Sequence, residues 1–260
     1  MFPQGFAGVE TQLWLWLIAM IRPGAAFFAA PIFGTRAVPV QVRLILSLAV
    51  GMAAMNSVVF TLPPGGVASF AGVLLVMGEV LAGLAMGFAL QIAYAAAFVA
   101  GETIGNAMGL GFASMVDPQS GASTQVVGQF LSILATLLFL GMNGHLLLIS
   151  YVVQSYQAIP PGGPMISNDA IYGLVMFGGS MLGAGVTVAL PVGFALILIQ
   201  LVMGMLARSA PSLNLFAVGM PAALIAGLVL LAMAAPIMAD GIATALQRGL
   251  DESQTLAEGK

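Results

Sequence analysis

Hydrophobic residues occupy this chain in six long runs, and short segments rich in glycine and proline separate them. Runs of about 20 apolar residues are typical of helices that cross a lipid bilayer. The pattern predicts an all-α polytopic membrane protein with about six long, partly kinked hydrophobic helices arranged as helical hairpins. The six runs cover residues 12–33, 44–62, 70–100, 126–157, 171–206 and 213–239.

Proline inside three of these runs raises the question of breaks. Arg22-Pro23 interrupts the first run, and because proline removes a backbone donor we expect either two shorter helices or one kinked helix there. Pro191 and Pro236 raise the same question in the last two runs. Several runs are longer than a bilayer needs, so we expect tilted helices or helices that extend past the lipid.

The composition favours one membrane domain over residues 1–260, which ends in a polar tail at 246–260. Hydrophobic residues make up 60% of the chain and charged residues 6%, whereas an ordinary soluble domain is about 25% charged. The net charge is −3 and no basic surface is visible, which excludes nucleic acid as a partner. The absence of cysteine excludes disulfides, thiolate metal sites and cysteine nucleophiles. No Lys or Arg precedes Arg22, so we expect no cleavable signal peptide.

Positive charge is distributed unevenly among the breaks between runs. Arg36 and Arg43 lie in the first break and Arg208 in the fifth, whereas the second, third and fourth contain no Lys or Arg. The positive-inside rule therefore puts the odd-numbered loops in the cytoplasm and both termini outside. Arg248 and Lys260 in the tail argue weakly against this topology.

Glycines recur at four-residue spacing in three places. On a helix such residues lie along one face and let a neighbouring backbone come close. Two interpretations are open: packing within the chain, which is common in membrane helices, and contact with other subunits. The sets are Gly83 with Gly87, Gly101 with Gly105 and Gly109, and Gly179 with Gly183.

The sequence offers no constellation for catalysis, a cofactor or a metal ion. There is one histidine, His145, and the acidic residues are scattered along the chain, so a metal site lacks ligands. We interpret His145, which follows Asn143-Gly144, as a structural, hydrogen-bonded residue. The adjacent carboxylates Asp251-Glu252 lie in the polar tail, where we expect them to be solvated.

Glu79 is the one carboxylate well inside an apolar run. A charge at membrane depth costs at least about 2.5–3.5 kcal/mol and is retained for a reason. Either Glu79 is such a buried charge, or it lies near the end of a helix that begins later in the run. Glu102 is a second possible buried charge, and the sequence does not decide whether it pairs with Arg208.

The most informative segment runs from Gly101 to Gly121 and is rich in glycine without any basic residue. Its methionine, leucine and phenylalanine side chains make it too apolar for a solvated linker, and Asp117-Pro118 predicts a sharp turn. Non-helical backbone at membrane depth is tolerated only where protein buries it or it lines an aqueous cavity. The segment is therefore either a compressible seal inside a channel or a re-entrant or interfacial segment with no gating role. The candidate gate residues are Gly105, Met108, Gly109, Gly111, Phe112, Met115, Asp117, Pro118 and Gly121.

Several short blocks of residues, in order along nearly the whole chain, carry a family resemblance. They are Arg22-Pro23, Ala30-Pro31-Ile32-Phe33-Gly34, Val38-Pro39 and Val42-Arg43; Gly101-Glu102-Thr103-Ile104-Gly105, Met108-Gly109, Phe112-Ala113-Ser114 and Asp117-Pro118; Asn143-Gly144-His145, Ser155 and Pro160; and Arg208 to Asn214 with Phe216, Gly219 and Pro221. Together these blocks resemble the FliR family, the export-gate subunit of flagellar type III secretion. One departure is Ser212, where the family often carries glutamine, and it affects only that loop.

The resemblance implies a pore-forming structural subunit of the gate, with neither enzymatic activity nor a cofactor. It implies FliP-like and FliQ-like subunits, an FlhB-like switch protein, exported unfolded protein substrates and membrane lipid as partners, in the flagellar basal body of the bacterial inner membrane. Residues 1–160 would form FliP-like hairpins and residues 165–245 a FliQ-like hairpin. The family's plug loop corresponds to about residues 106–122, centred on Phe112. The cytoplasmic hairpin tip corresponds to Arg208, Pro211 and Asn214.

Two other functional classes stay in view. A small-molecule secondary transporter should show inverted repeats around buried ionisable residues, and an intramembrane enzyme should show a nucleophile with its base. The sequence offers neither beyond Glu79 and His145. The choice of a flagellum over an injectisome rests on the Asn143-Gly144-His145 block.

Overall fold

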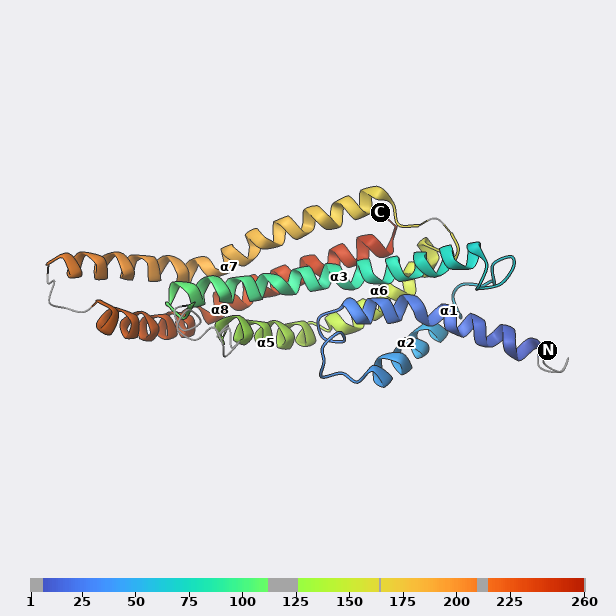
Figure 1. Cartoon of the computed structure of the whole chain (residues 1–260), viewed down its shortest axis with the longest axis horizontal. Helices are drawn as coiled ribbons and strands as arrows, with labels where there is room; N and C mark the ends of the chain where they lie inside the picture. The colour runs from blue at the N-terminus through green and yellow to red at the C-terminus, as the bar shows by residue number, and fades with distance from the viewer. Residues whose placement is uncertain (1–6, 112–125, 164, 210–214, 260) are drawn as a thin grey trace. The chain divides into compact units, whose positions relative to one another are not determined.

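The structure, a computed structural model, describes residues 7–111, 126–163, 165–209 and 215–259. Seven helices lie within these residues (Figure 1). They follow the predicted apolar runs, and the all-α polytopic class is confirmed. The helices are α1 Ala7–Ala29, α2 Val40–Ala54, α3 Phe70–Ala107, α5 Val126–Gly141, α6 Gly144–Ala158, α7 Asn168–Ser209 and α8 Leu215–Ala257.

Four of the described helices are long and apolar enough to cross a bilayer, and the bent pair of α5 and α6 adds a fifth candidate if it counts as one span. By contrast, α2 has 15 residues and is about 22 Å long, shorter than a hydrocarbon core of about 30 Å. The four candidate spans are Gly8–Ala29, Phe70–Ala107, Asn168–Leu206 and Gly219–Ala257.

The run at 126–157 forms two helices and not the single helix that the sequence predicted. α5 ends at Gly141, α6 begins at Gly144, and the two are bent by 63°. The cause is Asn143, whose φ of 56° is a left-handed conformation that a continuous helix does not contain. The backbone N–H of Leu147 donates to the Asn143 carbonyl at 3.1 Å, so α6 starts afresh there.

Proline does not divide the other runs. Pro23, Pro191 and Pro236 lie inside α1, α7 and α8, each of which continues through its proline as one helix. The first apolar run is therefore one helix and not two. Each proline leaves the carbonyl four residues earlier without its helical donor, which another group has to replace.

The last helix extends much further than its apolar run. α8 continues to Ala257, and Leu250 and Ser253 within the segment predicted to be a polar tail are buried. Buried residues in this segment recur at three- and four-residue spacing, which places them on one helical face, whereas Asp251 is exposed. The segment is therefore helical, with one face packed against the protein.

By its internal contacts the chain divides into two compact units. The first comprises Met1–Ala93, Leu140–Gly179 and Gln247–Lys260, and the second comprises Tyr94–Phe139 and Ser180–Leu246. α3, α7 and α8 each contribute residues to both units.

In the first unit α1 contacts α2 and α3 through glycines. A Cβ at Gly51 of α2 would lie 2.5 Å from the carbonyl oxygen of Ala19, and a Cβ at Gly83 of α3 would lie 2.2 Å from that of Arg22. Gly87, one turn further along α3, approaches the backbone of α1 in the same way. Only glycine allows these backbones to touch. The buried cluster beside them consists of Ile18, Ala19, Ala54, Phe60, Leu75 and Tyr156.

In the second unit α3 packs on α5 and α7 through similar contacts. A Cβ at Gly101 of α3 would lie 2.4 Å from the Cα of Gly128 in α5. A Cβ at Gly185 of α7 would lie 2.8 Å from the carbonyl oxygen of Ala96. Close approach within the chain therefore accounts for a glycine at position 101, as it does for the pair in the first unit.

The third set of spaced glycines has no such partner within the described residues. A Cβ at Gly179 or at Gly183 of α7 would meet no described atom within 4 Å. Packing within the chain thus explains Gly83, Gly87 and Gly101, whereas a Cβ at Gly105 would make only ordinary contacts, the nearest at 3.8 Å. The part of α7 around Gly179 and Gly183 presents its glycines on an open surface.

We predict that Gly83→Ala destabilises the protein by about 1–3 kcal/mol, the usual cost of overpacking. The added Cβ would collide with a backbone oxygen of α1, although alanine is the better helix former. Gly78→Ala, on the same helix with nothing within 4 Å, is the matched control and should leave stability unchanged or raise it. Thermal unfolding in detergent measures both variants, and equal melting temperatures would contradict the packing of α1 on α3.

Candidate functional site

α3 ends in a glycine cap where the predicted seal begins. Gly109 has a φ of 83°, and its N–H donates to the carbonyl of Asn106 at 3.0 Å. The N–H of Leu110 donates to the carbonyl of Gly105 at 3.0 Å. This is the Schellman arrangement, which ends a helix with a left-handed residue, and glycine adopts that conformation without strain. Met108, directly before the cap, is 2% exposed.

α3 and α5 lie side by side up to this cap. Gly101 meets the backbone of Gly128, and seven residues earlier on α3 the hydroxyl of Tyr94 lies 2.6 Å from Oγ1 of Thr136. Earlier residues of α3 thus contact later residues of α5, which makes the two helices antiparallel. The segment 112–125 therefore starts and finishes at the same end of this helix pair.

A side chain of α7 also contacts the end of α3. Nε2 of Gln200 donates to the carbonyl of Ala107 at 2.6 Å. The last carbonyls of a helix have no partner inside the helix, so this hydrogen bond satisfies one of them. The end of α3 is therefore tied to two neighbouring helices of the second unit.

The structure describes only some of the predicted gate residues. Gly105, Met108, Gly109 and Gly111 lie in the last turn of α3 and its cap. The other gate residues lie outside the described part of the chain, and they are Phe112, Met115, Asp117, Pro118 and Gly121. The gating role stays a prediction.

The predicted hairpin tip and the second acidic residue are also only partly described. Arg208 is exposed in the last turn of α7, whereas Pro211 and Asn214 lie outside the described residues. Glu102 is half-buried, and its Oε1 lies 2.9 Å from the position of a Cβ on Gly128. Between the described atoms of Glu102 and Arg208 there is no ion pair.

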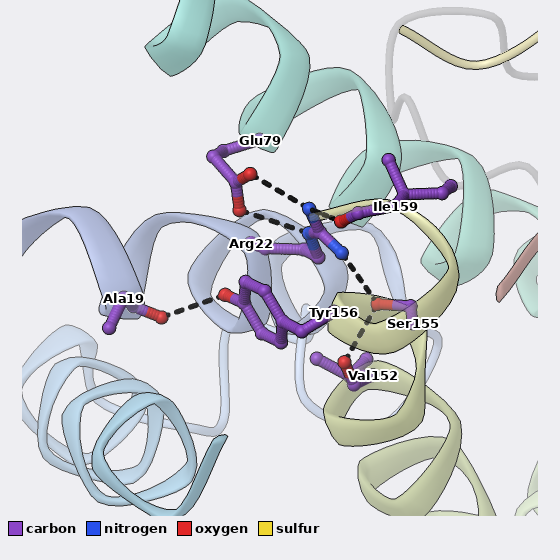
Figure 2. A network of polar contacts seen from close by, with 7 residues as sticks. All are labelled: Ala19, Arg22, Glu79, Val152, Ser155, Tyr156 and Ile159. Carbon is purple, nitrogen blue, oxygen red and sulfur yellow. Dashed lines mark hydrogen bonds and ion pairs between the residues drawn. The ribbon is translucent and has the colours of Figure 1, made fainter. Parts of the chain in front are cut away.

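A buried ion pair lies in the first unit (Figure 2). Nη2 of Arg22 donates to Oε1 of Glu79 at 2.8 Å, and Nε donates to Oε2 at 3.0 Å. Arg22 of α1 is 0% exposed and Glu79 of α3 is 2% exposed. Two parallel N–H···O bonds are among the strongest contacts that arginine makes with a carboxylate. Because α3 begins at Phe70, Glu79 lies in its third turn and not near a helix end.

α6 completes the surroundings of Arg22. Nη1 donates to Oγ of Ser155 at 2.9 Å, and Nη2 also donates to the carbonyl of Ile159 at 2.8 Å. The guanidinium carbon lies 4.0 Å from the ring centroid of Tyr156, within the range of a cation–π contact. These contacts join α1, α3 and the C-terminal end of α6 around one charge.

Pro23 explains a further contact in this network. Proline lacks the N–H that would bond the carbonyl four residues earlier, which here belongs to Ala19. The hydroxyl of Tyr156 donates to that carbonyl at 2.9 Å and replaces the missing donor (Figure 2). The Arg22-Pro23 step, which the sequence marked as a possible break, is therefore the place where α6 contacts α1.

A cavity of about 240 Å³ lies beside the ion pair. It has room for several water molecules, each of which occupies about 30 Å³ in the liquid. The charged groups that line it already have partners in the protein. Its lining consists of Arg22, Ala71, Leu74, Leu75, Gly78, Glu79, Ile159, Pro160, Gly162, Gly163 and Met165.

The sequence did not predict that Arg22 pairs with Glu79. The sequence did contain a signal for this pair, namely one positive and one negative residue that each lie alone in an apolar run. An unpaired charge in such a run costs free energy, so the two could have been expected to pair. His145 also differs from expectation, since its Nδ1 is buried and has no hydrogen-bond partner among the described residues. Within those residues, no three His, Asp or Glu side chains gather in a way that could hold a metal ion.

Comparisons with known proteins agree on one family. A sequence profile of the family described as "Bacterial export proteins, family 1" matches residues 13–249. The chain is 37% identical over 236 residues to the flagellar biosynthetic protein FliR of Escherichia coli K12, covering 89% of this chain and 90% of that protein. It is 37% identical to FliR of Pectobacterium carotovorum, over 84% of this chain and 83% of that protein. It is 31% identical to FliR of Bacillus subtilis, over 79% and 80%.

We predict that Arg22→Met and Glu79→Leu each destabilise the protein by about 3–5 kcal/mol, because each leaves the other charge buried and unpaired. The double variant should recover most of this loss, since no charge then remains. Tyr156→Phe removes one neutral hydrogen bond and should reduce the free energy of unfolding by about 0.5–1.5 kcal/mol. It serves as the reference for the larger losses expected from the ion pair. Unfolding in detergent gives the double-mutant cycle. Additive losses in the double variant would show that the two side chains are not coupled.

Proposed function

The chain belongs to the FliR family of bacterial export proteins, and from this premise we propose that it is a pore-forming structural subunit of a flagellar type III protein export gate. Family membership itself supports a role in flagellar protein export. In our proposal, the plug loop at about residues 106–122 helps to keep the export channel closed and lets unfolded flagellar proteins pass.

The observation that carries this proposal is the placement of the two ends of the segment 112–125. α3 ends and α5 begins at the same end of an antiparallel helix pair. A segment whose ends lie together extends at most about half of its contour length, roughly 25 Å at about 3.5 Å per residue. A helix is about 10 Å across. Such a segment can therefore reach past a neighbouring helix toward the axis of a multi-subunit assembly.

The composition of the segment suits a seal. Phe112 and Met115 supply bulky apolar side chains, and the glycines around them supply backbone freedom. A narrow apolar constriction excludes water and ions because it dewets. The role is passive: an unfolded substrate displaces the side chains, and the energy for export comes from other parts of the apparatus.

The outer surface of the long helices supports assembly with other subunits. In the most apolar 18-residue stretch of α7 only 28% of the residues are buried, and in that of α8 only 22% are. Most of these apolar residues are therefore not covered by the chain itself. α3, α7 and α8 have 38, 42 and 43 residues, about twice the number that a bilayer requires. Either the helices are strongly tilted in the bilayer, or other proteins cover the apolar length that extends beyond it.

We infer that FliP-like and FliQ-like subunits supply this cover, that an FlhB-like protein acts as the switch, and that lipid covers the remaining surface. In this arrangement residues 1–160 form the FliP-like part and residues 165–245 the FliQ-like part. The apolar helices make the chain a membrane protein, and we propose the bacterial inner membrane as its site. The positive-inside rule then puts Arg208 at a cytoplasmic tip.

The buried charge beside a cavity does not favour a small-molecule transporter. A transporter needs a polar group that is free to bind a solute or a proton. Here four of the five N–H groups of Arg22 donate to Glu79, to the hydroxyl of Ser155 and to a backbone carbonyl. This network is better explained as the contact that joins three helices of the first unit.

We predict that Phe112→Gly raises the ion permeability of cells that carry the assembled gate by about tenfold or more. Burial of a phenylalanine contributes about 1.5–3 kcal/mol, and a loss of 1.4 kcal/mol from the closed state is a tenfold change. Phe70→Gly, which removes a phenylalanine that is 80% exposed at the start of α3, is the matched control and should leave permeability unchanged. Unchanged ion flux in Phe112→Gly at normal protein levels would refute the seal.

A further inference from the structure

The chain between α2 and α3 includes a non-helical stretch at residues 58–62, which we call the extended segment. Its side chains alternate between core and surface. Phe60 is 6% exposed, whereas Val59 is 84% exposed and Thr61 is also exposed. Alternation with a period of two is typical of a β-strand, in which successive side chains point to opposite faces.

The inward side chains hold the extended segment on the first unit. Phe60 belongs to the buried cluster beside α1 and α2, and Val58 and Leu62 pack against that cluster. The ring centroids of Phe60 and Tyr156 lie 5.2 Å apart, and the hydroxyl of Tyr156 bonds the carbonyl of Ala19 in α1. The segment is therefore fixed in its extended form by the fold of this chain alone.

The backbone of the extended segment has unused hydrogen-bonding groups. The N–H of Val58 bonds the carbonyl of Ala54 at 3.3 Å, but the N–H and C=O groups of residues 59–62 have no partner among the described residues. In a strand the backbone groups of alternate residues point to the same edge. Val59 and Thr61 therefore present two N–H and two C=O groups along one edge, and because both residues are exposed we call it the open edge.

An extended polypeptide is the partner that fits the open edge. Lipid tails offer no donor or acceptor, and a helix uses its backbone groups internally. A second extended chain satisfies the donors and the acceptors of an edge together. Proteins that keep an edge from pairing usually place lysine or another charge on it. No charged residue occurs between Arg43 and Glu79, so the open edge carries no such protection.

We propose that the open edge, formed by the backbone of Val59 and Thr61, binds an extended, uncharged segment of another protein by β-strand pairing. Both outward side chains are β-branched, which favours β-branched or aromatic residues opposite them. The break between α2 and α3 contains no Lys or Arg, so the positive-inside rule puts the contact on the non-cytoplasmic side. Because the extended segment is already fixed, pairing costs this chain little conformational entropy. The inference rests only on that part of the proposed function in which the chain assembles with other proteins.

The first test is backbone hydrogen exchange in the particle that purifies in mild detergent, compared with the purified chain alone. Pro63 and Pro64 have no N–H, so a peptide covering residues 59–64 reports four amides. We expect two of them, those of Val59 and Thr61, to exchange at least about tenfold more slowly in the particle, because a hydrogen bond has to open before exchange. A helix or lipid over the same surface would leave both amides without acceptors. Equal exchange in the two samples would overturn the proposal.

The second test removes one donor from the open edge. Thr61→Pro lacks the N–H at that position, and we expect about tenfold less co-purification of the other proteins, which corresponds to about 1.4 kcal/mol. Thr61→Val is the matched control, because it keeps the N–H and a β-branched side chain, and it should co-purify them like the wild-type chain. Equal recovery with the two variants would contradict backbone pairing.

Thermal unfolding of each variant alone checks that the proline has not damaged the fold. We expect equal melting temperatures, because the N–H of Thr61 has no partner within the described residues. Should Thr61→Pro unfold at a lower temperature, the exchange comparison decides, since it uses the wild-type chain.

A second copy of this chain is the other extended partner that the tests distinguish. Pairing between copies would protect the amides of Val59 and Thr61 in the purified chain alone, and the protection would increase with protein concentration. That result would overturn the assignment to a different protein.

The outcomes also separate this inference from the proposed function. If other proteins co-purify but the two amides exchange freely, the open edge fails and the assembly stands. If the amides are protected and Phe112→Gly does not leak, the open edge stands and the seal fails. If no other protein co-purifies with the chain, the assembly fails and the open edge fails with it.

Discussion

In a chain with 6% charged residues, a polar group that folding removes from water costs free energy unless the protein itself supplies a partner. Arg22 shows this most fully, because Glu79 neutralises it and α6 supplies its remaining acceptors. The carbonyl of Ala19, which Pro23 leaves without a helical donor, receives the hydroxyl of Tyr156. The last carbonyl of α3 receives a side-chain amide of α7. Each of these contacts joins helices that are distant in the sequence. The hydrogen bonds that satisfy buried polar groups therefore also hold the helices in place.

The same constraint connects the fold to the proposed function. Asp117-Pro118 disfavours a continuous helix through the segment 112–125. Backbone groups outside a helix at membrane depth need protein or water around them, and lipid supplies neither. The centre of an assembled conduit supplies both, and the antiparallel pair of α3 and α5 starts and ends the segment at one place. In the proposed function, the bulky side chains of the segment would keep the passage dry.

Local signals made most of the helices predictable, because apolar runs and their glycine and proline breaks depend on neighbouring residues only. The break at Asn143 was not predictable, since it depends on the left-handed backbone of one residue, and neither was the extension of α8, whose buried face depends on distant helices. The candidate gate came from the composition of one segment and from family resemblance. The charges of Arg22 and Glu79 were both visible, but only the fold brings them together.

The central claim is that a glycine-rich segment between α3 and α5 lies inside a conduit built from several chains. The most direct measurement is a cryo-electron microscopy map of the particle that purifies in mild detergent through a tag on this chain. The account predicts that other chains cover the apolar faces of α7 and α8, and that residues 112–125 lie across the central passage. A map in which those residues lie on the outer, lipid-facing wall would contradict it.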